Sequence, residues 1–166
     1  MNFSFVHEFD TDVASYWKLF LSDPFNEDLF RELKIRERKV LKFEDNGKTL
    51  YRTQKMEPTT PLPGFLQSMI KDMGYTEIDK LDWASNIMRI IIEPASMKDR
   101  FKMEGDYVVT PLGDKRCRRE FKGEVKVSMP LIGGKVEKFM MEQLRDAYDT
   151  AARVTRKWIA EGKTGA

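Results

Sequence analysis

The chain has 166 residues and a formal net charge of +2, from 29 Lys and Arg against 27 Asp and Glu. Its length fits one domain that can bury about 70% of the surface of the unfolded chain, and its near-zero charge does not favour nucleic-acid binding. With 34% charged and 41% hydrophobic residues, one cysteine (Cys117) and one histidine (His7), the composition excludes a membrane-spanning protein, a disordered protein, an internal disulfide and most zinc sites.

The start of the chain predicts one strand followed by two short helices. Hydrophobic residues alternate from Phe3 to Phe9, which predicts a strand with His7 on its apolar face. Helical spacing then predicts two short helices, one over 13–20 and one over 25–33. The dipeptide Asp-Pro at positions 23–24 separates them.

A hairpin is predicted next. Two strand-like runs, Ile35–Phe43 and Thr49–Met56, flank the dipeptide Asn46-Gly47. Asn-Gly between alternating runs is the strongest short-range hairpin signal, because both residues tolerate positive φ. The first run has a strongly charged face, which we expect to contact solvent.

Hydrophobic residues recur at i, i+3, i+4 and i+7 over Leu62–Met73, which predicts a helix closed by Gly74. This insert is either an ordinary helix on the rim of the sheet or a lid that touches a membrane surface. Its only charged residues, Lys71 and Asp72, do not favour strong electrostatic attachment to anionic lipid.

The second half of the chain predicts four more strands and one long helix. The strand-like runs are Tyr75–Trp83, Asn86–Glu93, Arg100–Thr110 and Lys115–Met129. A helical pattern from about Lys135 to Ala160 spans about 40 Å. Short turns imply antiparallel pairing, so we expect an α+β fold in which a curved sheet of about seven strands wraps the long helix. Residues 1–160 form the expected single domain, and 161–166 a frayed tail.

This order of elements resembles the START-like superfamily, also called the helix-grip or birch-pollen-allergen-like fold. The resemblance covers nearly the whole chain, and its most suggestive segment is the Gly-Gly loop that opens the last helix, Met129-Pro130-Leu131-Ile132-Gly133-Gly134-Lys135-Val136-Glu137-Lys138. The segment Phe5-Val6-His7-Glu8-Phe9, Trp17 and Asp23-Pro24 also look similar. The Gly-Gly segment is similar to a stretch at the same place in an uncharacterised bacterial family of that superfamily. The superfamily includes lipid carriers, hormone receptors, aromatase/cyclases and chaperone co-activators.

The ten methionines and nineteen aromatic residues concentrate at apolar positions of the predicted sheet, insert and last helix. They either fill the core or line a deformable pocket for an apolar ligand. The predicted lining is Phe65, Met69, Trp83, Met88, Ile90, Met103, Tyr107, Phe121, Val125, Met140, Leu144 and Tyr148. Tyr107, Tyr148, Gln143 or His7 would supply one or two polar contacts.

Other polar features have structural interpretations. Gly133-Gly134 lacks any phosphate-binding motif and fits a loop-to-helix transition or a flexible gate. His7 fits a hydrogen-bonded core residue, with acid/base chemistry as the alternative. Cys117 fits a passive thiol. The alternating charges of 116–126 fit a solvated strand face.

The leading hypothesis is therefore a carrier or sensor of an apolar or amphipathic molecule, such as a lipid or sterol-like compound. The alternatives are an aromatase/cyclase-like enzyme and a protein-interaction module with a filled core. We expect no cofactor, metal, catalytic residue or nucleic acid, and a possible partner is a membrane surface. No secretory signal opens the chain, which predicts a cytoplasmic protein; the pattern leaves the oligomeric state undetermined.

Overall fold

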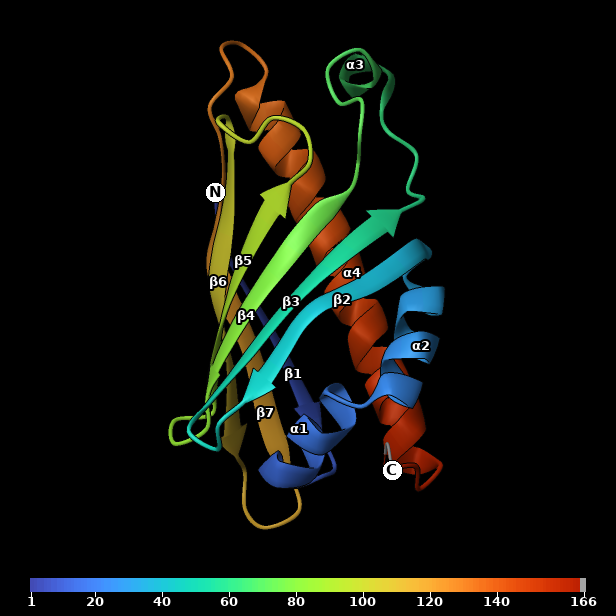
Figure 1. The fold of residues 1–166 in the computed structure, drawn as a ribbon, viewed down its shortest axis with the longest axis vertical. Coiled ribbons are helices and arrows are strands. Elements are labelled where there is room, and N and C mark those ends of the chain that lie inside the picture. Colours follow the sequence, from blue (N-terminus) through green and yellow to red (C-terminus); the bar gives the residue numbers. More distant parts are fainter. Residues whose placement is uncertain (165–166) are drawn as a thin grey trace.

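A computed structural model describes residues 1–164 of the chain. A seven-stranded antiparallel sheet wraps one long helix, with two short helices at one end (Figure 1). The strands are β1 (Asn2–Phe9), β2 (Ile35–Asp45), β3 (Thr49–Pro58), β4 (Tyr75–Asp82), β5 (Ile87–Pro94), β6 (Phe101–Pro111) and β7 (Cys117–Val127). The helices are α1 (Val13–Phe20), α2 (Asp23–Glu32), α3 (Gly64–Gln67) and α4 (Gly133–Ala160).

The strand order is β1-β7-β6-β5-β4-β3-β2, so only β1 is paired out of chain order. This confirms the predicted α+β helix-grip architecture. The predicted β2–β3 turn is also present, with Gly47 at φ 82° and the Asn46 side chain accepting from the Thr49 amide at 2.8 Å. Inward positions alternate with outward charged positions along β6 and β7, as their sequence pattern requires.

The helix predicted over Leu62–Met73 is wrong in extent, because α3 covers only Gly64–Gln67. Leu66 and Ile70 are buried. The helical spacing of apolar residues in this segment therefore reflects two side chains that anchor it to the core, and the helix does not continue through it. No side chain caps the start of α3. A helix this short is not stable by itself, because its few hydrogen bonds do not offset the free-energy cost of nucleation. Gly74 is not a helix cap; it precedes β4, and its amide donates to the Asp72 carboxylate at 2.7 Å.

Helix α4 has 28 residues and contacts mainly β7, β1 and α2. Its buried side chains include Val136, Met141 and Ala152, which belong to the main core between helix and sheet. None of the helices within residues 1–164 is long and apolar enough to cross a bilayer. After α4, the Lys163 amide donates to the Trp158 carbonyl; the last two residues of the predicted tail lie outside the described part.

Two glycines let aromatic rings lie directly on the backbone of β6 and β7. Gly105 pairs with Gly123 across these strands, and a Cβ on Gly123 would lie 2.1 Å from the Glu104 carbonyl oxygen and 2.9 Å from the Phe3 ring. Phe3 packs against Phe121 with ring centroids 4.9 Å apart. Any larger side chain at Gly123 would force backbone atoms apart.

We expect Gly123→Ala to lower the free energy of unfolding by about 3 kcal/mol, because the clashing neighbours are main-chain atoms. Gly134→Ala is the matched control, since a Cβ there meets nothing within 4 Å and alanine favours a helix. Urea unfolding of both variants measures the effect. Equal stability of the two variants would contradict the close approach.

Candidate functional site

Ten of the twelve predicted ligand residues lie in or pack against the main core between the sheet and α4, and one of the ten is the half-buried Trp83. The buried ones, on β5–β7, are Met88, Ile90, Met103, Tyr107, Phe121 and Val125. The half-buried ones, on α4, are Met140, Leu144 and Tyr148. The Tyr148 ring stacks on Phe121 at 4.6 Å between centroids, which brings helix and sheet together here.

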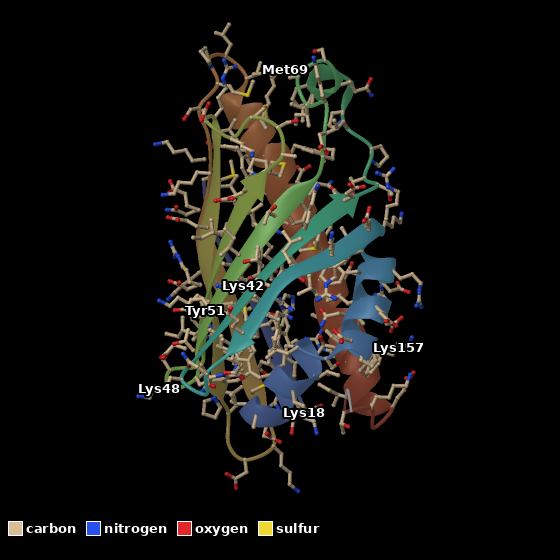
Figure 2. All side chains as sticks on the ribbon, in the orientation of Figure 1. Lys18, Lys42, Lys48, Tyr51, Met69 and Lys157 are labelled. Carbon is tan, nitrogen blue, oxygen red and sulfur yellow. The ribbon has the colours of Figure 1, made fainter. Side chains whose placement is uncertain are left out.

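The other two predicted ligand residues lie at the end of the molecule that carries α3. Phe65 is 44% exposed on α3, and Met69 follows α3 at the same end of the molecule (Figure 2). Trp83 lies in a mostly apolar cleft of about 420 Å³ between α1 and the β4–β5 turn. Trp17 lines this cleft and packs against Tyr107 at 6.0 Å between ring centroids, so one layer of side chains separates the cleft from the core.

A second depression, of about 380 Å³, lies on the outer face of β5–β7. It is lined by charged side chains such as Arg89, Glu104 and Asp106. Arg89 is already ion-paired with both carboxylates, at 3.0 Å and 3.2 Å. We therefore interpret this depression as a solvated, self-paired surface, and we place the candidate site on the concave face.

Arg119 of β7 is the largest polar side chain in the core, at 1% exposure. Its guanidinium donates to the Tyr148 carbonyl at 3.2 Å and contacts the Tyr16 hydroxyl at 3.5 Å. The Tyr16 and Tyr107 hydroxyls share a hydrogen bond of 2.5 Å. Burial raises the pKa of both phenols, so each keeps its proton and can donate.

His7 connects Arg119 to α4 in one defined tautomer. Arg119 Nη2 lies 2.9 Å from His7 Nδ1, and because arginine only donates, Nδ1 accepts. His7 Nε2 therefore carries the proton and donates to Asp149 Oδ1 at 2.9 Å. Burial and the Arg119 charge lower the pKa of His7, against an opposing effect of Asp149. His7 is thus a partly buried, hydrogen-bonded residue with no free basic nitrogen.

A second polar group lies on the inner face of β3 and β4. Arg52 Nε donates to Asp79 Oδ2 at 2.7 Å, and these residues are 3% and 0% exposed. Arg52 Nη1 and Asp79 Oδ1 are buried and have no hydrogen-bond partner among residues 1–164. An unsatisfied buried donor or acceptor costs about 1–3 kcal/mol, and more when charged.

Neighbouring polar side chains extend this pair into a small network. Glu77 Oε1 accepts from Gln54 at 2.8 Å and lies 3.6 Å from Arg52 Nη2. Burial and then the Glu77 carboxylate raise the pKa of Asp79. The same two causes, in the same order, raise the pKa of Tyr148 on α4. Several titratable groups thus converge on the concave face, opposite α4.

Arg52, Asp79 and Arg119 are buried but are not among the predicted site residues. The signal was present, because Arg52 has the same parity as Leu50 and Met56, which are buried. Arg119 likewise lies on the inward face of β7, two residues from Cys117 and two from Phe121, which are also buried. The alternating charges of 116–126 predicted a solvated strand face, and Arg119 lies on the opposite, inward face. Cys117 is fully buried, and burial raises the pKa of its thiol to about 11.

Residues 4–159 match the model of the family DUF2505, described as a protein of unknown function. A search of curated proteins finds no match. Norcoclaurine synthase from Thalictrum flavum, solved with dopamine and hydroxybenzaldehyde, is similar at a TM-score of 0.66 and 15% identity, over 98% of this chain and 88% of that one.

Two bacterial structures are similar over nearly their whole length. Zhui aromatase/cyclase from Streptomyces sp. R1128 has a TM-score of 0.65 at 11% identity, covering 95% of this chain and 92% of that one. A START superfamily protein from Mycobacterium smegmatis has 0.59 at 17% identity, covering 95% and 98%. These likenesses show the START-like fold that the sequence predicted.

The pH dependence of stability tests the His7 tautomer. A histidine whose folded-state pKa is lowered stabilises the fold above its unfolded pKa of about 6.5, and this stability is lost as the pH falls through the folded value. We expect Tm to fall more between pH 7 and pH 5 in the wild type than in His7→Gln, whose amide preserves both hydrogen bonds. Parallel Tm curves would show that His7 does not resist protonation.

Removing one or both charges tests the Arg52–Asp79 pair. Arg52→Met leaves Asp79 buried without its cation, so we expect a loss of about 3–5 kcal/mol in urea unfolding. The double variant Arg52→Met/Asp79→Leu should remain within about 1 kcal/mol of the wild type, because apolar replacement of a whole buried pair is often neutral. Arg89→Met on the outer face is the control and should cost under about 1 kcal/mol. Equal losses in the single and double variants would mean that the pair stabilises the fold.

Proposed function

Since the chain belongs to the DUF2505 family and has the START-like fold, we propose that it binds an apolar or amphipathic small molecule between its sheet and α4. The class that we propose is a lipid or sterol-like compound carrying one polar group. Transport or sensing of that compound in the cytoplasm is part of the proposal. No catalytic residue is needed for this function.

The observation that carries this proposal is the buried pair Arg52–Asp79, in which Nη1 and Oδ1 lack partners among the described residues. A buried ion pair that leaves one donor and one acceptor unsatisfied contributes little to the stability of the fold. It suits a ligand hydroxyl, which can accept from Arg52 and donate to Asp79. Asp79 is opposite Ile90 in the β4–β5 register, so apolar surface for the ligand body begins beside the polar end.

The cleft between α1 and Trp83 supports the same proposal. Its volume of about 420 Å³ lies in the range of small-molecule sites. Trp17 and Trp83 meet there edge to face at 6.4 Å between centroids. Because Trp17 also packs on Tyr107, we propose that a ligand enters the core by displacing this indole layer.

An enzyme of the aromatase/cyclase kind is the second candidate function. One observation favours it, namely that Asp79, Glu77 and Tyr148 converge on one face and that burial raises the pKa of Asp79 and Tyr148. Such groups can exchange protons with a bound substrate. A carrier and an enzyme differ in the fate of the bound molecule. Recovery of an unchanged molecule after incubation supports the carrier, and recovery of one that has lost water supports the enzyme.

Native mass spectrometry and a dye titration test the proposed binding. We expect a co-purifying apolar species, and saturable binding of the neutral dye N-phenyl-1-naphthylamine. A ten-carbon alcohol should displace the dye about tenfold better than the alkane of equal length, because two hydrogen bonds are added.

The control is the double variant Arg52→Met/Asp79→Leu, which should bind alcohol and alkane alike. Asp106→Asn removes a carboxylate from the outer face and should leave the tenfold difference unchanged. Absence of both a bound species and dye binding would refute the proposal. Equal displacement by alcohol and alkane in the wild type would refute the role of Arg52 and Asp79.

A further inference from the structure

Three loops meet at the end of the molecule where α4 begins (Figure 1). They are residues 59–74 around α3, residues 95–100 between β5 and β6, and residues 128–132 before α4. The Asp72 amide donates to Ser96 Oγ at 3.1 Å, and the Ser128 amide donates to the Arg100 carbonyl at 2.7 Å. The middle loop therefore connects the other two, and the three form one surface, which we call the loop end.

Leu131 is held away from the protein at this loop end. Its side chain is 102% exposed, and its backbone has φ 67°, a value that bulky residues rarely adopt. The Ile132 amide donates to the Pro130 carbonyl at 2.9 Å across Leu131, a tight three-residue turn that is strained at positive φ. On one side the turn is fixed by Gly133, where a Cβ would lie 2.7 Å from the Val127 carbonyl oxygen.

This combination is costly without a partner. A strained backbone that exposes a whole leucine side chain contributes nothing to the core, and strain of this kind clusters at functional positions. Phe65 on α3 is a second exposed apolar side chain, at 44%. Met69 lies at the same end, as Figure 2 shows.

The charges around these side chains are mainly positive. The three loops together with the first six residues of α4, that is residues 59–74, 95–100 and 128–138, contain five cations, Lys71, Lys98, Arg100, Lys135 and Lys138, against three carboxylates. Two of the carboxylates are turned toward main-chain amides: Asp72 accepts from Gly74 at 2.7 Å and Glu137 from Val127 at 2.9 Å. These carboxylates keep their charge, so the three segments together carry a net charge of +2.

We propose that the loop end docks on a bilayer surface containing anionic lipid, with Leu131 and Phe65 entering the interfacial region. Single apolar side chains on separate protruding loops, surrounded by lysines and arginines, fit the mixed apolar and anionic character of that region. The core of a protein–protein interface is an apolar patch, whereas Leu131 and Phe65 are single exposed side chains on separate segments. The proposal does not depend on the ligand-binding function, because it rests on the surface alone.

Sedimentation with vesicles tests this docking. We expect the full chain to bind vesicles of phosphatidylcholine with phosphatidylglycerol, and to bind pure phosphatidylcholine vesicles much more weakly because the cations lose their partners. Leu131→Ser and Phe65→Ser should each weaken binding about tenfold through lost apolar burial. Leu112→Ser is the matched control: Leu112 is 39% exposed in the β6–β7 turn at the opposite end, and its replacement should change nothing.

Leu131→Gly separates docking from folding. Glycine relieves the positive φ, so we expect Tm to stay equal or rise while vesicle binding falls as in Leu131→Ser. A lower Tm would show that Leu131 has a structural role, which contradicts the proposal. Failure of the wild type to bind anionic vesicles, or undiminished binding by Leu131→Ser, would also overturn it and would direct attention to a protein partner.

Discussion

The guanidinium group of Arg119 holds α4 on the sheet. It contacts His7 of β1, the Tyr148 carbonyl of α4 and the Tyr16 hydroxyl of α1. No carboxylate among residues 1–164 pairs with it directly, and aromatic faces surround it, with Phe9 at 5.0 Å and Tyr107 at 5.4 Å. The carboxylate nearest to it in the hydrogen-bond chain is that of Asp149, which His7 connects to Arg119. Neutral His7 is therefore the link that lets a buried cation and a surface carboxylate stabilise each other.

This anchoring is one-sided, and the asymmetry shapes the concave face. Helix α4 contacts β1 and β7 closely, while β3 and β4, toward the β2 edge of the sheet, carry the second polar group, around Arg52 and Asp79. The two buried cations differ in character. Arg119 bonds to β1, α1 and α4, whereas Arg52 bonds to its neighbours Asp79 and Glu77 on β4. Each group keeps unused hydrogen-bonding atoms, since Arg119 Nε, Arg52 Nη1 and Asp79 Oδ1 are all buried without a partner among residues 1–164.

Much of the fold could be predicted from the sequence because its signals are local. Alternation along β6 and β7, the Asn46-Gly47 turn and the 3.6-residue period of α4 each act over a few residues. The insert was mispredicted because Leu66 and Ile70 anchor an irregular loop at spacings that a helix also satisfies. The polar site was missed for another reason: charge at Arg52, Asp79 and Arg119 conflicts with their inward parity, and only tertiary partners resolve that conflict. The exposure of Leu131 had no signal in the pattern at all.

The placement of the three tryptophans has a spectroscopic consequence. Trp17 and Trp83 form one edge-to-face pair beside the apolar cleft, and Trp158 belongs to a separate core cluster, where its indole donates to Asp28 at 2.8 Å. The Trp17 indole N–H is buried without a partner among the described residues, whereas that of Trp83 donates to Asp45 at 2.9 Å. The three indoles thus lie in environments of different polarity. The intrinsic fluorescence of the unlabelled protein therefore contains separate reporters for the cleft and for the α2–α4 packing.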